Sequence, residues 1–366
     1  MTAERRPEPI PAHDARGYYE KNICSSAALL CAAPAGAAES TRCFNADGPK
    51  LSVQSGVVRD GLRLLLRVPG LRGDNFLRAA RNYVNSESSW KAPRGYTITR
   101  AALKNCGAEL LHKDGEPRER AVLLLHGGAY ILKLSNIYRG MAVRYSRMAG
   151  DADVFSPDYR LAPEHVFPAA LDDALDAWNW LLAQGYKPEN ILVVGDSAGG
   201  NLALALTLSL RDAGRPLPRA LVCMSPWTDM TGSGESHIKN ADIDPIFGNN
   251  PEYMPPKDGA MPKTLPFILS YVGKTDPKNP YLSPVFASYT GFPPMLIQVG
   301  TDEILESDSE IVYRHAVDAG VDATLTRYYG LFHVFQIFGD ALPESRHAWE
   351  EVRQFIALKF LAPLPR

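Results

Sequence analysis

The chain has 366 residues, of which 45% are hydrophobic and 22% are charged. These values exclude wholesale disorder and fibrous repeats, and the length allows one large core or two smaller ones. The chain has 39 Lys and Arg residues against 41 Asp and Glu residues, so its net charge of -2 provides no positive electrostatic field that would attract a nucleic acid. The five cysteines have no CxxC spacing, which argues against a disulfide framework or a zinc site and favours a reducing cytoplasm.

An apolar stretch over residues 23–38 is the feature that argues for secretion instead. It contains Ala35-Gly36-Ala37, which is similar to a signal-peptidase site. A long polar segment with several acidic residues precedes it, whereas a secretory leader begins with a short basic region. Secretion is therefore the minority alternative to a cytoplasmic location. No run approaches the ~20 apolar residues that are needed to cross a bilayer.

Residues 1–95 are predicted to form a helical N-terminal region that has no strands. Helical periodicity appears over residues 57–68 and again over residues 75–85. The first of these helices has an apolar face, made of Val58, Leu62 and Leu65. Its basic side chains are expected to be solvated; they are Arg59, Arg63 and Arg67. Two amphipathic helices without a sheet of their own need a body to lie on.

From residue 96 to residue 366 short apolar runs alternate with longer helical patterns. This alternation is typical of an α/β fold, with a mostly parallel central sheet flanked by helices. The runs predicted as strands are residues 96–103, 109–112, 121–125, 153–156, 191–194, 220–224, 295–299 and 324–328. Several are apolar throughout, which indicates interior strands that are buried on both faces. Residues 232–273 form an irregular, proline-rich insertion, and we expect it to lie near a functional site.

The segment Gly195-Asp196-Ser197-Ala198-Gly199 carries the sharpest chemical signal, because it fits G-x-S-x-G between a predicted strand and a predicted helix. A serine at such a turn has a strained backbone, and its hydroxyl lies at the positive end of a helix. Taken alone, the serine could equally be a helix N-cap. The preceding strand and the partners described below favour Ser197 as a nucleophile.

A glycine pair directly follows the predicted strand 121–125. Acyl transfer places negative charge on a former carbonyl oxygen, and preorganised backbone N–H groups stabilise that charge. We predict that Gly127, Gly128 and Ala198 supply these donors, the last because the residue after the nucleophile points its N–H to the same place. Taken alone, a Gly-Gly pair is often only a turn. The neighbouring His126 is expected to fix this loop and not to act as a base.

A serine hydroxyl needs a base to take its proton, and the base needs an anion to orient it. His333 follows the last predicted strand and is the predicted base, while Asp302 follows the strand before it and is the predicted anion. The chain order Ser197, Asp302, His333 is the one expected for a G-x-S-x-G hydrolase. Two other acids compete with Asp302. Glu303 is expected to point away if Asp302 points in, and Asp308 is expected to lie in the following helix.

Three motifs resemble those of the hormone-sensitive-lipase-like branch of the α/β-hydrolases. They lie at residues 126–129 (HGGA), 195–200 (GDSAGG) and 158–165 (DYRLAPEH). With the segments around Asp302 and His333, the resemblance spans about residues 103–361. It implies an α/β-hydrolase fold and a carboxylic ester hydrolase, with a helical N-terminal cap over the site and residues 96–366 as the catalytic domain.

Two details accompany this resemblance. Ala129 stands where many relatives have a third glycine, which leaves a backbone donor in place but makes the loop less free to adapt. Arg160 and Glu164 are expected to form a structural ion pair within the third motif.

The leading functional hypothesis is a serine carboxylesterase that hydrolyses small to medium acyl esters through an acyl-enzyme, without metal or cofactor. Tyr130, Trp227 and Phe332 adjoin the motifs and could line an acyl pocket, although ordinary core positions are the alternative. A lactonase or a deacetylase of a secondary metabolite would use the same groups. A ligand receptor built on an inactive hydrolase is disfavoured, because Ser197 and His333 are both present. The expected partner is a small-molecule ester, and a homodimer is an open alternative to a monomer.

Overall fold

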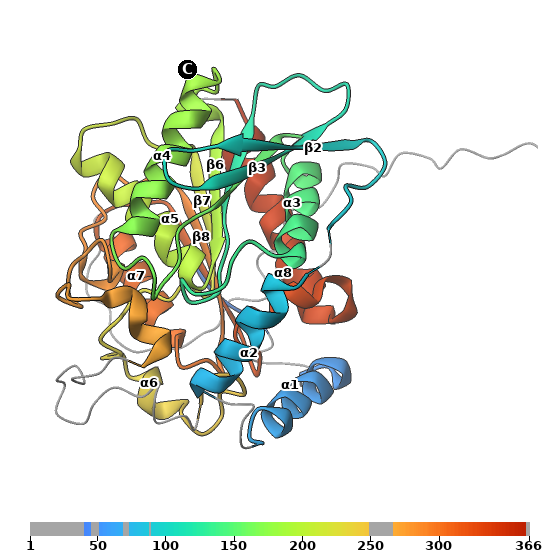
Figure 1. The fold of residues 1–366 in the computed structure, drawn as a ribbon. Coiled ribbons are helices and arrows are strands. Elements are labelled where there is room, and N and C mark those ends of the chain that lie inside the picture. The colour runs from blue at the N-terminus through green and yellow to red at the C-terminus, as the bar shows by residue number, and fades with distance from the viewer. Residues whose placement is uncertain (1–39, 45–50, 69–72, 88, 249–265, 364–366) are drawn as a thin grey trace, which may run out of the picture.

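The computed structural model describes residues 40–44, 51–68, 73–87, 89–248 and 266–363 (Figure 1). The apolar stretch at residues 23–38 lies outside the described residues, as does part of the predicted insertion, residues 249–265. Within the described ranges, no helix is both long and apolar enough to cross a membrane.

A nine-stranded sheet forms the centre of the described part of the chain. Its strands are β1 (Ser40–Phe44), β2 (Tyr96–Ala102), β3 (Gly107–Lys113), β4 (Ala121–Leu125), β5 (Asp153–Asp158), β6 (Ile191–Asp196), β7 (Ala220–Met224), β8 (Met295–Gly300) and β9 (Ala323–Tyr328). Their order across the sheet is β1-β9-β8-β7-β6-β4-β5-β3-β2. The pairs β2·β3 and β3·β5 are antiparallel, and the other pairs are parallel. The prediction of a mostly parallel sheet is confirmed.

Helices cover both faces of this sheet (Figure 1). The α-helices of the described ranges are α1 (Val53–Leu65), α2 (Gly73–Asn85), α3 (Asn136–Met148), α4 (Ala169–Ala183), α5 (Ala198–Asp212), α6 (Ser236–Lys239), α7 (Glu306–Asp318) and α8 (Pro343–Phe355). A short 3₁₀ helix, η3, spans Phe267–Val272. The helices α4, α5 and α7 pack on one face of the sheet, and α3 and α8 pack on the other.

The interior strands are buried on both sides, as their unbroken apolar runs predict. In β6, Val193 packs into the cluster that includes Leu202 of α5, while Val194 packs into the cluster that includes Trp349 of α8. Every residue of β4 and β6 is buried. This double-sided packing fixes the carboxyl ends of the central strands, where the predicted catalytic residues follow.

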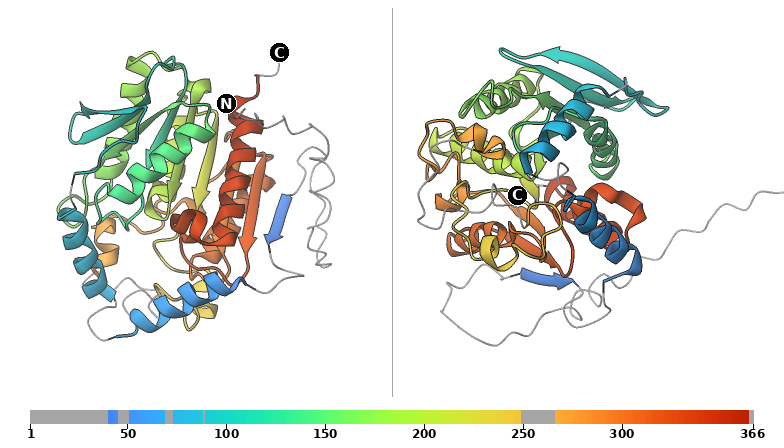
Figure 2. Two further views of the ribbon diagram at one scale, coloured as in Figure 1. Left: turned by 90° about the vertical axis from the view of Figure 1, so that its right-hand side faces the viewer. Right: turned by 60° about the horizontal axis from the view of Figure 1, so that its bottom comes forward.

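The prediction of a strand-free N-terminal region is wrong for β1, which pairs in parallel with β9 (Figure 2, left). Its sequence, STRCF, has no apolar run, because a short strand at the edge of the sheet buries little surface. The structure therefore does not break cleanly at residue 95. The two predicted helices are present, although α1 begins at Val53 and α2 at Gly73, a few residues earlier than expected.

The helices α1 and α2 lie at the lower end of the sheet in Figure 1, near α6. In α1, Val58 and Leu62 pack against the body as predicted. Leu65, which was predicted on the same buried face, is 53% exposed. Arg59 and Arg63 were predicted to be solvated, but their side chains are only 23% and 25% exposed. The side chains of Arg59 and Arg63 thus turn toward the body, where both form ion pairs with Asp302.

The expected ion pair between Arg160 and Glu164 is also wrong. Arg160 instead makes a bidentate contact with the buried carboxylate of Asp173 on α4, with Nη2 lying 2.8 Å from Oδ1. Glu164 pairs with Arg81 of α2 at 2.7 Å. Both charges of the motif therefore find partners on helices, one of which belongs to the N-terminal region.

Candidate active site

The turn from β6 into α5 has the strained geometry that the G-x-S-x-G pattern predicts. Ser197 has φ 52° and ψ -121°, a conformation that costs free energy for any residue with a Cβ atom. Its neighbours must be small: a Cβ atom at Gly195 would lie 2.2 Å from the carbonyl oxygen of Gly199. A Cβ atom at Gly199 would lie 2.0 Å from the carbonyl oxygen of Leu125 on β4. Glycine at both positions lets the turn pack directly on the neighbouring strand.

The predicted base lies against the predicted nucleophile. Nε2 of His333, on the loop after β9, is 2.9 Å from Oγ of Ser197, although the two residues are 136 positions apart in the sequence. Both residues are 7% exposed, so the pair is largely shielded from bulk water. This is the contact that the chemistry of an activated serine requires.

The acid that contacts His333 is Glu303, and the prediction of Asp302 is wrong. Nδ1 of His333 lies 2.8 Å from Oε2 of the buried Glu303. The other oxygen, Oε1, accepts hydrogen bonds from the N–H of Gly300 at 2.6 Å and from the hydroxyl of Ser225 at 2.7 Å. Three donors therefore surround this carboxylate and fix its orientation.

Asp302 points to the N-terminal helix. Its Oδ2 lies 3.4 Å from Nη1 of Arg59 and 3.9 Å from Nη2 of Arg63. Burial raises the pKa of Asp302, and the two guanidinium groups oppose that rise. Asp302 and Glu303 are adjacent and follow the end of a strand, so no hydrophobic periodicity indicates which of the two side chains points inward. The signal that could have chosen Glu303 is its extra methylene, which lets its carboxylate fold back onto Gly300.

The loop after β4 corrects a second prediction. The N–H of Gly127 donates to the hydroxyl of Tyr138 at 2.9 Å, so this amide is already used within the protein. The Tyr138 hydroxyl donates in turn to Oδ2 of Asp196, also at 2.9 Å. Burial raises the pKa of Asp196 to about 6, against the opposing hydrogen bond from Tyr138. This chain of bonds ties the glycine loop to the residue that precedes Ser197.

The next amides of this loop have no such partner. Gly128 and Ala129 both have positive φ, at 110° and 55°. Among the described residues, no hydrogen bond is formed by the N–H groups of Gly128, Ala129 or Ala198, the last being the first residue of α5. These donors are available to a ligand beside Ser197.

His126 has the structural role that the sequence predicts. It is fully buried, its Nδ1 lies 2.9 Å from the carbonyl oxygen of Gly127, and its ring stacks on Tyr159 at 4.1 Å. The hydroxyl of Tyr159 donates to the His126 carbonyl oxygen at 2.6 Å. Burial lowers the pKa of His126. The histidine therefore shapes the loop from behind.

A family comparison agrees with this geometry. The sequence pattern of a family described as having an alpha/beta hydrolase fold matches residues 122–337, more than half of the chain. The chain belongs to the α/β-hydrolase family. An acetyl-hydrolase from Streptomyces hygroscopicus is 37% identical over 267 residues, which cover 72% of this chain and 83% of that protein. An esterase from Acinetobacter venetianus is 35% identical over 231 residues, 63% of this chain and 72% of that protein.

Solved structures place this hydrolase in the hormone-sensitive-lipase-like branch. The esterase EstE5, in a crystal soaked with p-nitrophenyl butyrate, is 35% identical with a TM-score of 0.72, covering 85% of this chain and 100% of that one. An esterase from the bacterial hormone-sensitive lipase family is 33% identical with the same TM-score and coverage. The predicted branch is confirmed, and the hydrolase is a carboxylic ester hydrolase of the serine type.

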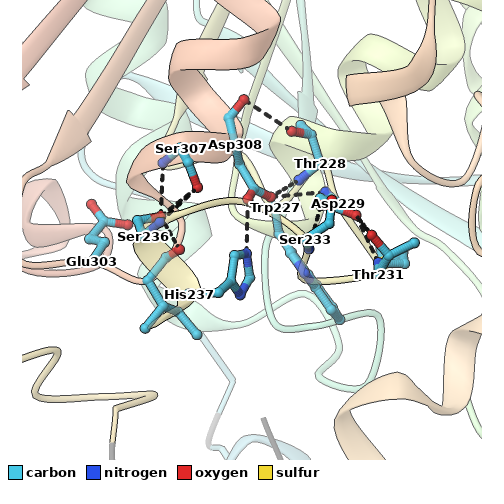
Figure 3. Close-up of polar contacts among 12 residues, drawn as sticks. Trp227, Thr228, Asp229, Thr231, Ser233, Ser236, His237, Glu303, Ser307 and Asp308 are labelled. Carbon is cyan, nitrogen blue, oxygen red and sulfur yellow. Dashed lines mark hydrogen bonds and ion pairs between the residues drawn. The ribbon is translucent and has the colours of Figure 1, made fainter. Parts of the chain in front are cut away.

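A network of polar contacts, here called the polar brace, joins the loop after β7 to α7 near Glu303 (Figure 3). The buried carboxylate of Asp308, in α7 as predicted, accepts from the backbone N–H groups of Thr228 and Asp229 at 2.8 and 2.9 Å. Its other oxygen lies 3.0 Å from Nε2 of His237. Burial alone would lower the pKa of His237. The hydrogen bond with Asp308 and the charge of Asp308 act in the opposite direction and together outweigh burial, so the net effect is a raised pKa.

The brace continues on both sides of Asp308. The hydroxyl groups of Ser236 and Ser307 lie 2.6 Å apart (Figure 3). The Nδ2 group of Asn240 donates to the carbonyl oxygens of Thr301 and Glu303 at 2.9 and 2.7 Å. The N–H of Trp227 donates to the carbonyl oxygen of Ser197 at 3.0 Å. The loop after β7 therefore holds the backbone of both the serine and the acid.

Two of the predicted acyl-pocket residues lie in the core of the hydrolase. Tyr130 is 1% exposed, stacks on Tyr271 and donates its hydroxyl to Oδ1 of Asn201 at 2.7 Å. Phe332 is 0% exposed and packs edge-on against Phe338. These two predictions are therefore wrong for an open pocket. Trp227 is also a buried member of the core, although it is slightly more exposed, at 7%.

The sequence analysis did not single out Phe247, whose ring lies edge-on against the His333 ring with centroids 4.9 Å apart. Phe247 belongs to the described part of the predicted insertion, so this part of the segment contacts His333. Among the described residues, no three His, Cys, Asp or Glu side chains are grouped so that they could hold a metal ion.

Proposed function

We propose that this esterase hydrolyses small to medium acyl esters through an acyl-enzyme on Ser197. The observation that carries the proposal is the continuous chain of contacts from Oγ of Ser197 to Nε2 of His333 at 2.9 Å, and from Nδ1 to Glu303 at 2.8 Å. Glu303 takes the role for which the sequence suggested Asp302. The order of the three residues along the chain is the one found in this fold.

In the first half of the reaction, Oγ of Ser197 bonds to the ester carbonyl carbon while Nε2 of His333 takes the hydroxyl proton. Glu303 holds the imidazole and stabilises its positive charge. The tetrahedral intermediate then collapses: the bond to the alcohol oxygen breaks, and His333 gives the proton to the leaving alcohol. In the second half, water attacks the acyl-serine with His333 as its base, and the acid is released.

The oxyanion of each tetrahedral intermediate is assigned to the N–H groups of Gly128, Ala129 and Ala198. Ala129 replaces Gly127 in this role, because Gly127 donates to Tyr138. The α5 N-terminus adds its positive dipole at Ala198. Removing one such donor typically costs about 3 kcal/mol of transition-state stabilisation.

A small to medium acyl group is supported by the relatives and by the closed character of the site. A relative is named an acetyl-hydrolase, and the esterase EstE5 was soaked with p-nitrophenyl butyrate. Ser197 and Trp227 are each 7% exposed, and Phe247 lies against the base. The name of the acetyl-hydrolase also favours a deacetylase of a larger acetylated molecule as the second candidate, whereas the assembled triad disfavours a non-catalytic receptor.

The division of labour along the chain is part of this proposal. Residues up to about 95 provide a cap through α1 and α2, and residues 96–366 provide the catalytic domain, to which β1 adds an edge strand. A cytoplasmic location and a homodimer stay predictions from the sequence.

The test compares acetyl, butyryl, octanoyl and lauroyl esters of p-nitrophenol. We expect the highest kcat/KM for the acetyl or butyryl ester, and a loss of about 10⁶-fold in kcat for Ser197→Ala. Ser146→Ala is the matched control, because Ser146 is also buried, on α3, and its hydroxyl has no partner among the described residues. Turnover retained by Ser197→Ala would refute the mechanism, and a clear preference for the lauroyl ester would refute the acyl size.

A further inference from the structure

The basic side chains of α1 contact the loops that carry the catalytic groups. Arg59 and Arg63 are four residues apart and share one side of α1, and Arg67 lies in the turn just after the helix. Arg59 and Arg63 are about three-quarters buried, at 23% and 25% exposure. Arginine side chains that only faced solvent would be more exposed than these two. The hydrogen bonds and ion pairs that the arginines form identify the loops that they hold.

Arg59 bridges two of the catalytic loops. Its Nη1 lies 3.4 Å from Oδ2 of Asp302, the residue before Glu303, and donates to the carbonyl oxygen of Gly330 at 3.4 Å. Gly330 begins the loop that carries His333. One guanidinium group therefore joins the loop of the acid to the loop of the base.

Arg63 and Arg67 hold a third loop. Nη2 of Arg63 donates to the carbonyl oxygen of Ile243, and Nη2 of Arg67 donates to that of Asp242 at 3.4 Å. The same segment carries Phe247, whose ring lies against His333. Asp244 also holds this segment, because its carboxylate accepts hydrogen bonds from the N–H groups of Phe247 and Ile304 at 3.0 and 2.8 Å.

The helix has a separate anchor that does not involve its arginines. Glu344 of α8 accepts from the N–H of Ser52 at 2.7 Å, from the Ser52 hydroxyl at 2.8 Å and from the Ser55 hydroxyl at 2.6 Å. Partly exposed ion pairs contribute little to stability. Replacing the arginines should therefore leave α1 in place and change only what they hold.

We propose that Arg59 and Arg63 are positioning residues, which keep Asp302 turned away from His333 so that Glu303 alone orients the imidazole. The inference rests on the proposed function. Two carboxylates stand side by side at positions 302 and 303, and only one can accept from Nδ1. The arginines offset the charge of Asp302, which would otherwise add to the field at the imidazole.

The charged groups around this pair define the expected response to pH. His333 is faced by Glu303 and lies within reach of the charges of Asp196 and Asp244. Asp302 is faced by Arg59, Arg63 and Glu306. Removing the two arginine charges leaves a net negative surrounding, which favours the protonated imidazole. Because the base must be neutral, the acid limb of the kcat/KM profile should move to higher pH.

The experiment uses the full chain with Arg59→Gln and Arg63→Gln combined. We expect kcat to fall about tenfold with little change in KM, and the acid limb to move up by roughly half a pH unit. Adding Asp302→Asn should return the limb to its original position, and the paired Lys substitutions, which keep the charge, should not shift it. Arg81→Gln is the matched control, because Arg81 is a cap arginine of similar exposure, 21%, whose partners are Glu164 and the Ala162 carbonyl.

A double variant with the wild-type kcat and pH profile would overturn the inference, as would an equal loss in Arg81→Gln. Loss of activity that simply follows a lower thermal midpoint would also overturn it, because the role would then be structural. Ser197→Ala separates the two levels. If that variant is inactive while the arginine variants behave as wild type, this inference fails and the proposed function stands; if Ser197→Ala retains turnover, the proposed function itself fails.

Discussion

Replacing Glu303 by glutamine should inactivate the esterase through the tautomer of His333. Oε1 of Glu303 accepts from the N–H of Gly300 and from the hydroxyl of Ser225, so the amide oxygen of Gln must occupy that side. The NH₂ group then faces Nδ1 of His333, which can only accept from it. The imidazole proton moves to Nε2 and points at Ser197, so the imidazole can no longer take the serine proton.

The size of the effect follows from this wrong tautomer. In a serine protease whose acid is replaced by its amide, kcat falls about 10⁴-fold, which corresponds to about 5 kcal/mol. We expect a fall of 10³- to 10⁴-fold, as an order of magnitude, in kcat/KM for Glu303→Gln. Asp302→Asn should lose about tenfold or less, because Asp302 contacts arginines 3.4 and 3.9 Å away and acts on His333 only through its charge.

The assay is steady-state hydrolysis of p-nitrophenyl butyrate, with the fraction of competent enzyme counted by an organophosphonate titrant and folding checked by circular dichroism. Both variants should be folded, since each replaces an acid by its isosteric amide. The reasoning would be refuted by the reverse order, in which Asp302→Asn is nearly inactive and Glu303→Gln keeps activity within tenfold of the wild type.

Three further outcomes follow from the packing around the nucleophile. Because burial raises the pKa of Asp196 to about 6, its contribution to stability is present below its ordinary pKa of 3.8 and is lost as the pH rises through about 6. Between about pH 4 and about pH 7 the wild type should lose about 2 kcal/mol more unfolding free energy than Asp196→Asn, measured with urea; parallel curves would contradict this. Tyr138→Phe should lower the free energy of unfolding by about 1–3 kcal/mol and lower kcat, since Gly127 and Asp196 lose their shared hydrogen-bond partner. Unchanged kinetics would show that these two hydrogen bonds do not position the glycine loop. Gly199→Ala should prevent folding or lower the free energy of unfolding by more than about 3 kcal/mol. Gly61 has open space around it, so Gly61→Ala should stabilise α1 by about 0.5–1 kcal/mol and raise the thermal midpoint. Equal effects of the two substitutions would contradict the packing argument.

The nucleophile and the base could be predicted because local sequence determines where they lie. An apolar run fixes β6, the glycines at 195 and 199 permit the turn, and Ser197 can then occupy only its tip. His333 follows the last strand of a parallel sheet, and the carboxyl ends of parallel strands share one edge. The strands themselves follow from unbroken apolar runs in the interior.

The acid could not be predicted, because its identity depends on contacts with a remote segment. Arg59, which draws Asp302 away, lies 243 positions earlier in the chain. Gly127 was assigned wrongly for a more local reason: the hydroxyl that accepts from its N–H belongs to Tyr138 on α3, and the sequence does not show that this side chain turns back onto the glycine loop. The edge strand β1 was missed because a short polar segment has no apolar signature, and its pairing with β9 spans most of the chain. Local pattern fixes backbone position, whereas partner choice among polar groups is a property of the assembled fold.

The most direct test of the central claim is to react the enzyme with a p-nitrophenyl phosphonate and locate the adduct by peptide mass spectrometry. The account predicts one phosphonyl group per chain, on Ser197, with activity lost in proportion to labelling and no labelling of Ser197→Ala. Complete inactivation with the adduct on another residue, or continued turnover after Ser197 is fully modified, would contradict it.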